Sequence, residues 1–287
     1  MDFSFQCVGI VGMGLIGGSM AKTIRNRMDA EILGYNRTIA IEEKAVAEGV
    51  INDSLRGKEG CPDLFIVSLY PDATVEYVKS NLNRFKKGCV IVDCCGTKTK
   101  VCKELSALCD ANGIFFVGGH PMAGIEKSGY DYSFDGLFNQ AAMILCRDEY
   151  TNEDAYQALK QYFIRLGFGR IRESDYKEHD QVIAFTSQMA HVVSNAYIKS
   201  PTCNDRYGFS AGSFKDLTRV AYLNETMWTE LFMENREALL HEIKFFLKSM
   251  EAYETALENN DYEGLKQLLR DGRICKEKDN ENERNGK

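Results

Sequence analysis

Long apolar runs are absent from the sequence. The longest, such as residues 64–70, have the length of a strand and fall far short of the roughly 18 residues that a membrane helix needs. The N-terminus carries Asp2 and no basic stretch, and its apolar residues lead directly into a glycine-rich loop instead of a cleavage site. We therefore expect neither a membrane span nor a signal peptide, and we expect a cytoplasmic location.

The sequence also lacks a metal-binding cysteine pattern and a surplus of positive charge. Its 10 cysteines lie scattered in apolar contexts without a C-x-x-C pair, so we expect reduced thiols and no metal site. The net charge of -7 argues against a nucleic-acid surface, because a phosphate backbone binds to clustered positive charge. An anionic ligand would have to be held by a few local cations.

The pattern of apolar residues predicts two domains. Over residues 1–172, short apolar strands alternate with helical stretches, which is typical of a mainly parallel, doubly wound sheet. From about Asp175 onward helical periodicity takes over, most clearly over residues 227–257. The predicted fold class is therefore an α/β Rossmann-type dinucleotide-binding domain followed by an all-α C-terminal domain at residues 173–275. The charged segment 276–287 is expected to be disordered.

The first strand and the loop after it predict a dinucleotide-binding site. The apolar strand Cys7–Val11 precedes a G-x-G-x-x-G motif that opens a helical pattern. In this motif the first glycine permits the tight turn, the second lets the backbone approach the pyrophosphate, and the third allows close helix packing. The candidate cofactor-binding residues of this loop are Gly12, Gly14, Leu15, Ile16 and Gly17.

The end of the second predicted strand bears on the choice of cofactor. An NAD site usually has Asp or Glu about 20 residues after the glycine motif, but this sequence has Asn36, Arg37 and Thr38. A carboxylate would repel a 2′-phosphate, whereas these three residues can donate hydrogen bonds to one. NADP is therefore favoured over NAD, although NAD stays possible. The alternative for Arg37 is a solvated surface charge.

Histidine is scarce, and its placement is informative. Three of the 4 histidines fall in two short segments, residues 118–124 and 179–191, both downstream of the glycine motif. Histidine titrates nearest to neutral pH, so His120, at the end of a predicted strand after the cofactor site, is a candidate for proton transfer. The alternative is that each histidine is a hydrogen-bonded structural residue.

In these segments the sequence resembles the prephenate and arogenate dehydrogenases of the TyrA family, over nearly its whole length. The resemblance rests on the order and spacing of six segments, Gly12–Ser19, Asp93–Lys98, Gly119–Glu126, His179-Asp180, Ala211–Arg219 and Met227-Trp228. It implies an enzyme of tyrosine biosynthesis that oxidises prephenate or arogenate, a 4-hydroxycyclohexadiene, to a phenol with loss of CO₂ and hydride transfer to NAD(P)⁺. It also implies a helical domain that completes the substrate pocket and forms a homodimer.

The resemblance assigns roles to individual residues. His120 is expected to accept the proton of the substrate hydroxyl, and Arg219 is expected to bind a substrate carboxylate through its planar guanidinium. His191 and Trp228 correspond to pocket residues around the substrate side chain. Glu126 corresponds to a carboxylate at the pocket entrance that can interact with Arg219.

Two positions depart from the family pattern. Gly96 stands where many members have a serine that binds the substrate hydroxyl, so Thr97 or a water molecule is expected to take over that contact. Gln188 replaces a histidine, so the preference between pyruvyl and alanyl side chains can differ. His179 either orients the domain junction or lines the pocket.

Two other functions remain open. A β-hydroxyacid dehydrogenase shares the glycine motif, an Asn-Arg-Thr segment and a helical second domain, but such enzymes use a lysine on a helix as the acid or base. A non-catalytic nucleotide-sensing protein would fit Gly96 and Gln188. His120 and Arg219 argue against a sensor, because it needs no proton acceptor.

Overall fold

The computed structural model describes residues 3–284, which divide into two compact units, the first ending at Asn235 and the second beginning at Arg236. Within the described residues, no helix combines the length and the apolar character that crossing a membrane requires.

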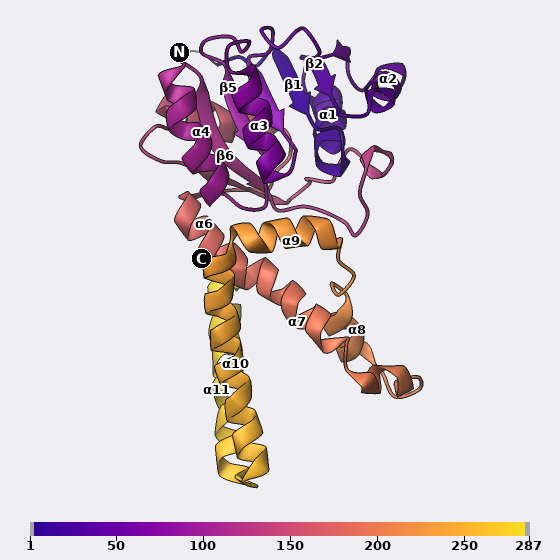
Figure 1. Ribbon diagram of the computed structural model, residues 1–287, viewed down its shortest axis with the longest axis vertical. Helices are drawn as coiled ribbons and strands as arrows, with labels where there is room; N and C mark the ends of the chain where they lie inside the picture. Colours follow the sequence, from indigo (N-terminus) through magenta and orange to yellow (C-terminus); the bar gives the residue numbers. More distant parts are fainter. Residues whose placement is uncertain (1–2, 285–287) are drawn as a thin grey trace. The chain divides into compact units, whose positions relative to one another are not determined.

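The first unit is built on one eight-stranded sheet with the order β3-β2-β1-β4-β5-β6-β7-β8 (Figure 1). All neighbouring strands are parallel except β6 and β7. The strands are β1 Cys7–Val11, β2 Glu31–Tyr35, β3 Asp53–Ser54, β4 Leu64–Val67, β5 Val90–Asp93, β6 Phe115–Pro121, β7 Ala142–Cys146 and β8 Arg170–Ser174. Because β1 lies between β2 and β4, the strand order reverses beside it, which is where open α/β sheets bind ligands.

Helices cover both faces of this sheet. They are α1 Leu15–Arg27, α2 Ile39–Ala47, α3 Pro71–Asn81, α4 Thr99–Ala111 and α5 Glu153–Arg165, with a short 3₁₀ turn, η1, at Tyr130–Tyr132. Successive strand side chains point to opposite faces, so Ile10 and Ile66 join one core with α1 and α5, while Val11 and Phe65 join the other with α3 and α4. Figure 1 shows α3 and α4 side by side on their face.

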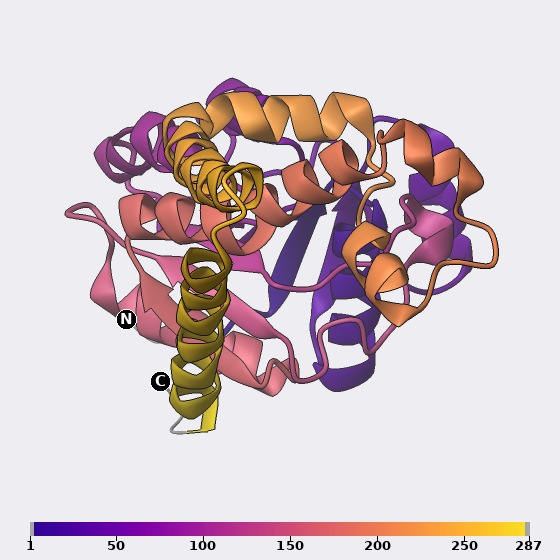
Figure 2. The same cartoon turned by 90° about the horizontal axis from the view of Figure 1, so that it is seen from below.

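The remainder of the first unit is helical. Its elements are α6 Tyr176–Ile183, a π-helical segment η2 at Ala184–Met189, α7 Ala190–Tyr197, a 3₁₀ turn η3 at Pro201–Asp205, α8 Gly212–Thr218 and α9 Glu225–Glu234. The segments α6, η2 and α7 form one continuous helix, and α9 runs beside it in both views (Figures 1 and 2). The side-chain amide of Gln188 donates to the carbonyl of Leu231 at 3.2 Å, which ties the two helices together.

The predicted helical stretch at residues 227–257 is interrupted. Helix α9 ends at Glu234, and the capping residue Asn235 has a φ of -103° and a ψ of 27°. The side chain of Asn235 is buried and donates to the backbone oxygen of Asp180 at 2.8 Å and to Oε1 of Gln188 at 2.9 Å. The Asn235 side chain thus provides hydrogen bonds to two oxygen atoms on the neighbouring helix. Such a tertiary contact is not indicated by periodicity alone.

The second unit is a pair of helices, α10 Arg236–Glu258 and α11 Tyr262–Arg284, joined by a turn in which Asn260 has a φ of 51°. The prediction of a disordered tail is wrong for residues 276–284, which continue α11. Ion pairs one helical turn apart, Arg273 with Glu277 and Lys276 with Asp279, favour helix there. Residues 285–287 lie outside the described residues.

The predicted fold class is confirmed, with a mostly parallel α/β part followed by helices. The sheet extends slightly beyond the predicted domain, because β8 ends at Ser174 and α6 begins at Tyr176. The boundary between residues 172 and 173 stays a prediction, and the division into compact units falls later, after Asn235.

Candidate functional site

The glycine loop after β1 is shaped for an anionic ligand. Gly12 has a φ of 90°, which favours glycine. A Cβ on Gly17 would overlap the carbonyl oxygen of Gly12, so helix α1 packs directly on the loop. A Cβ on Gly14, in contrast, would meet no described atom within 4 Å. The first turn of α1 has neither a side-chain cap nor an acidic residue, so its N–H groups and the open space beside Gly14 fit a pyrophosphate.

The end of β2 lies beside this loop and is rich in polar contacts. Oδ1 of Asn36 accepts a hydrogen bond from the backbone N–H of Met13 at 3.1 Å, so Asn36 holds the glycine loop in place. The backbone N–H of Asn36 donates to Oε1 of Glu42 at 2.8 Å. Glu42 is buried and is neutralised by Arg56, whose Nη2 lies 2.9 Å from its Oε1. A carboxylate does reach the end of β2, but it comes from α2 and is already paired.

Arg37 and Thr38 follow Asn36 and are both exposed. Among residues 3–284, the Arg37 side chain has no hydrogen-bond or ion-pair partner, so its guanidinium is available to a ligand.

A buried ion pair lies between β5 and β6. Asp93 and Lys98 are both inaccessible to solvent, and their carboxylate and ammonium groups are in direct contact. Asp93 Oδ1 also accepts the backbone N–H of Gly119 at 3.0 Å, and Lys98 Nζ donates to the Gly119 carbonyl at 2.6 Å. The pair therefore binds both the N–H and the carbonyl of Gly119, the residue that precedes His120.

Asp180, from α6, caps the start of α4. Its Oδ1 accepts the backbone N–H of Lys98 at 2.7 Å, and its Oδ2 accepts that of Thr99 at 2.8 Å. Burial would raise the pKa of Asp180, but hydrogen bonds from His179 and Thr99 outweigh it and hold that pKa below its usual value. A carboxylate at a helix N-terminus is further stabilised as the anion, so Asp180 is ionised.

His179 and His120 extend this chain of hydrogen bonds. His179 Nδ1 lies 2.7 Å from Oδ1 of Asp180, and His179 Nε2 lies 2.9 Å from Nδ1 of His120. His179 is buried and His120 is half-buried. Within the described part of the chain, Nε2 of His120 has no hydrogen-bond partner. The arrangement therefore presents one ring nitrogen of His120 to a ligand.

Both imidazoles are held in the neutral form. Burial lowers the pKa of His120 well below its usual value, and the neighbouring His179 and Lys98 lower it further. Burial also lowers the pKa of His179, although its hydrogen bond to Asp180 opposes the shift. A neutral imidazole can accept a proton, so His120 is suited to act as a base.

Four of the predicted substrate-binding residues form two contacting pairs. Nη1 of Arg219 lies 3.2 Å from Oε1 of Glu126, and both side chains are exposed. The rings of His191 and Trp228 have their centroids 3.9 Å apart. His191 Nδ1 lies 3.0 Å from the carbonyl oxygen of Val220, the residue after Arg219, so the two pairs are neighbours in the structure. Glu126 lies on the loop that follows β6, the strand that carries His120.

Two other predicted site residues are engaged within the protein. The hydroxyl of Thr97 is buried and donates to Oε2 of Glu234 at 2.8 Å. The Gln188 side chain is bonded at both ends, to Asn235 and to Leu231. These hydrogen bonds all connect to α9 or to Asn235, which directly follows it. The predicted substrate contacts of Thr97 and Gln188 stay predictions.

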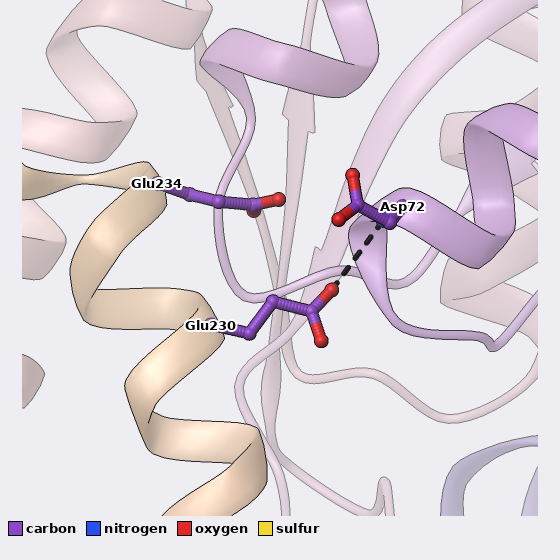
Figure 3. A group of neighbouring side chains, drawn as sticks. All are labelled: Asp72, Glu230 and Glu234. Carbon is purple, nitrogen blue, oxygen red and sulfur yellow. Dashed lines mark hydrogen bonds between the residues drawn. The ribbon is translucent and has the colours of Figure 1, made fainter.

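Glu234 belongs to a group of acidic side chains that joins α9 to the sheet domain. Glu230 and Glu234 on α9 point toward Asp72 at the start of α3, and the backbone N–H of Asp72 donates to Oε1 of Glu230 at 3.4 Å (Figure 3). The Lys100 ammonium contacts Asp72 and lies 3.1 Å from Oε1 of Glu234. Lys100 thus neutralises part of the negative charge of this cluster by pairing with Asp72 and Glu234, and these contacts hold α9 beside Thr97.

Comparisons with known proteins identify the family. The family model described as "Prephenate dehydrogenase, nucleotide-binding domain" matches residues 20–171, and "Prephenate dehydrogenase, dimerization domain" matches residues 175–271. The chain belongs to the prephenate dehydrogenase family. The predicted resemblance and the predicted enzyme class, a dehydrogenase, are thereby confirmed, and the β-hydroxyacid dehydrogenase alternative is set aside.

Several relatives match over most of their length. A prephenate dehydrogenase of Lactococcus lactis is 29% identical over 92% of this chain and 75% of its own. A cyclohexadienyl dehydrogenase of Zymomonas mobilis is 30% identical over 90% of each chain. The crystal structure of the prephenate dehydrogenase from A. aeolicus, in complex with hydroxyphenyl propionate and NAD⁺, has a TM-score of 0.86 and 28% identity, and covers 97% of this chain and 99% of that one.

Sequence reasoning missed the supporting residues of the site. It gave no role to Asp180 or Lys98 beyond the motifs that contain them, and it overlooked Glu42, Arg56 and Asn235 altogether. The His179-Asp180 pair was visible as a family motif, but its partner His120 is 59 residues away in sequence. For Glu42 and Arg56 no local signal exists, because their contacts arise only when α2 and the segment after β3 meet the end of β2.

The glycine loop allows a matched pair of substitutions. Gly14→Ala is expected to fold with the stability of the wild type and to bind NADP more weakly, because its methyl group would occupy the ligand space. Gly17→Ala is expected to lower the free energy of unfolding by about 1–3 kcal/mol, since its methyl group would overlap backbone. Thermal unfolding and calorimetric titration with NADP measure both effects. Unchanged NADP affinity in Gly14→Ala would show that this loop does not hold the nucleotide.

Proposed function

We propose that this enzyme oxidises prephenate or arogenate and releases CO₂, which leaves a phenol. The observation that carries the proposal is the hydrogen-bonded series from Asp180 through His179 to His120, which leaves a neutral ring nitrogen at the carboxyl end of β6. The loop after β1 opens at the same edge of the sheet, because β1, β4, β5 and β6 are parallel. The hydroxyphenyl propionate bound by the A. aeolicus relative is itself a phenol with a short acid side chain.

The proposed reaction places one proton on His120. The substrate hydroxyl gives its proton to Nε2 of His120. At the same time, the ring carbon that carries this hydroxyl loses a hydride. When bound, the oxidised nicotinamide supplies the acceptor for that hydride. Cleavage of the bond to the ring carboxylate then releases CO₂ and returns an electron pair to the ring. The oxygen recovers its proton from His120 as the ring becomes aromatic.

The remaining side chains of the site are proposed to hold the substrate. Arg219 binds the ring carboxylate, because a planar guanidinium can bind a carboxylate through two hydrogen bonds. The ring carboxylate then competes with Glu126 for this guanidinium. His191 and Trp228 line the part of the pocket that receives the substrate side chain. Thr97 and Gln188 were predicted to contact substrate, and their bonds to Glu234 and Asn235 favour the role of holding α9 in place.

For the cofactor, the end of β2 favours NADP. Arg37 is exposed and unpaired among the described residues, and Thr38 beside it is exposed as well. The negative charge of Glu42 would repel a 2′-phosphate, but it is neutralised by an ion pair with Arg56. The cofactor residues proposed here are those of the glycine loop together with Asn36, Arg37 and Thr38.

A homodimer is proposed for the enzyme. The family model that covers residues 175–271 describes a dimerization domain. In the second unit, Phe245, Leu247 and Leu257 each have 60% or more of their surface exposed. Several large exposed apolar side chains on one helix favour a protein interface.

The experiment that tests the function is reduced-nicotinamide formation by the purified protein. Prephenate and arogenate are each offered with NADP and with NAD. We expect turnover with at least one substrate, faster with NADP at limiting cofactor. Binding of NADP without turnover of either substrate would mean that the chain has become a nucleotide sensor.

Two substitutions separate chemistry from binding. His120→Asn removes the proton acceptor and is expected to lower kcat by about 10²–10⁴ with a modest change in KM. Arg219→Ala is expected mainly to raise KM for the substrate, by about tenfold to a hundredfold, because it removes a charge-assisted contact. Steady-state kinetics measure both, and unchanged kinetics in either variant would remove that residue from the mechanism.

Arg37→Ala tests the cofactor preference. We expect affinity for NADP to fall by about tenfold, since a charged hydrogen bond to the 2′-phosphate is lost, while affinity for NAD stays the same. Calorimetric titration with each dinucleotide measures the change. Lys44→Ala, which removes an exposed cation on α2 that pairs with Asp131, is the control. An equal loss for both dinucleotides after Arg37→Ala would contradict a 2′-phosphate contact.

A further inference from the structure

We propose that His179 is a positioning residue for the dehydrogenation, which, backed by Asp180, fixes the tautomer of His120 and shares the proton that His120 receives. This inference rests on the proposed function, because it assigns His120 as the base.

The carboxylate of Asp180 is ionised. It accepts two backbone N–H groups at the start of α4 and has no hydrogen of its own to give. The 2.7 Å contact with His179 therefore requires that Nδ1 of His179 carries a hydrogen. Because His179 is neutral, its Nε2 has none and can only accept.

The hydrogen position on the second ring is constrained in the same way. Nε2 of His179 lies 2.9 Å from Nδ1 of His120, so Nδ1 of His120 must donate. In a neutral His120 the lone pair then resides on Nε2, the nitrogen without a partner in the described part of the chain. The tautomer that suits a base is thus set by His179, a residue on α6.

The surroundings explain why His120 needs this support. The charged groups packed around the two rings are Lys98, Asp93, which pairs with Lys98, and Asp180. Burial and the Lys98 charge make a positive His120 costly. When a proton binds to Nε2 of His120, the ring can lose the added positive charge if the hydrogen on its Nδ1 moves to Nε2 of His179. The positive charge then lies on His179, in direct contact with the Asp180 carboxylate, and no other bond changes.

The tautomers can be observed without turnover. The chain has 4 histidines, so ¹⁵N-histidine NMR of the wild-type protein at neutral pH gives few signals, and His120→Asn and His179→Gln assign two of them. We expect His120 and His179 both to carry their hydrogen on Nδ1. An Nε2–H form at His120 would overturn the proposal, and this readout does not depend on whether the proposed substrate is correct.

Kinetics test the shared proton through two variants of His179. The glutamine of His179→Gln can accept the hydrogen bond from His120 but cannot take a proton, whereas His179→Phe does neither. We expect kcat to fall by about tenfold in the first and about a hundredfold in the second, with little change in KM. The acid limb of the kcat/KM profile should move to lower pH in His179→Phe, because the base loses the acceptor that stabilises its protonated form.

The control is the same substitution at an exposed histidine of α10, His241→Gln, which should leave kcat and the pH profile unchanged. A wild-type pH profile in His179→Phe, or equal losses in the two His179 variants with an unmoved acid limb, would reduce His179 to a structural role. Absence of turnover in the wild type would instead count against the proposed function, and the NMR result would still decide the tautomer.

Discussion

The buried pair of Asp93 and Lys98 is the interaction on which the site depends. Two charges without solvent access are stable only when each is fully bonded, and removing one partner of such a pair costs about 3–5 kcal/mol. Here Asp93 also accepts the backbone N–H groups of Gly119 and Cys95, and Lys98 donates to the carbonyl of Gly119. The end of β6, the strand that carries His120, is thereby fixed. Together with burial, the Lys98 charge keeps the His120 imidazole neutral.

A second constraint joins the helical part to the sheet. Asp180 on α6 satisfies two N–H groups at the start of α4, next to Lys98, and its backbone oxygen accepts from Asn235. One residue thus links the cofactor domain, the helix that carries His179 and His191, and the end of α9. Because these bonds are buried, a shift of α6 would leave several polar groups unsatisfied, which explains how a base on a strand and its support on a helix stay in register.

The nucleotide end of the site is organised differently. The glycine loop is determined by close backbone approach, whereas the neighbouring end of β2 is held by polar side chains. Asn36 binds the loop, and Glu42 and Arg56 neutralise each other beneath it. Because Glu42 is already paired with Arg56, the exposed Arg37 keeps a free charge at this end of β2 in the part of the chain that the structure describes. Cofactor preference in such a site depends on which charges are free, and not only on the residue that ends the strand.

Much of the fold and the main candidate residues followed from the sequence. The glycine loop was predictable because its backbone geometry is a local property, and His120 because a motif places it at a strand end. The partners of His120 and the internal bonds of Thr97 and Gln188 were not, since each joins segments far apart in the chain. The helical ending at residues 276–284 was missed because charge pairs one turn apart outweigh the lack of apolar residues. The sequence by itself determined which chemical groups are available; the tertiary structure decided which of them are free, because burial and pairing are set by contacts between distant segments.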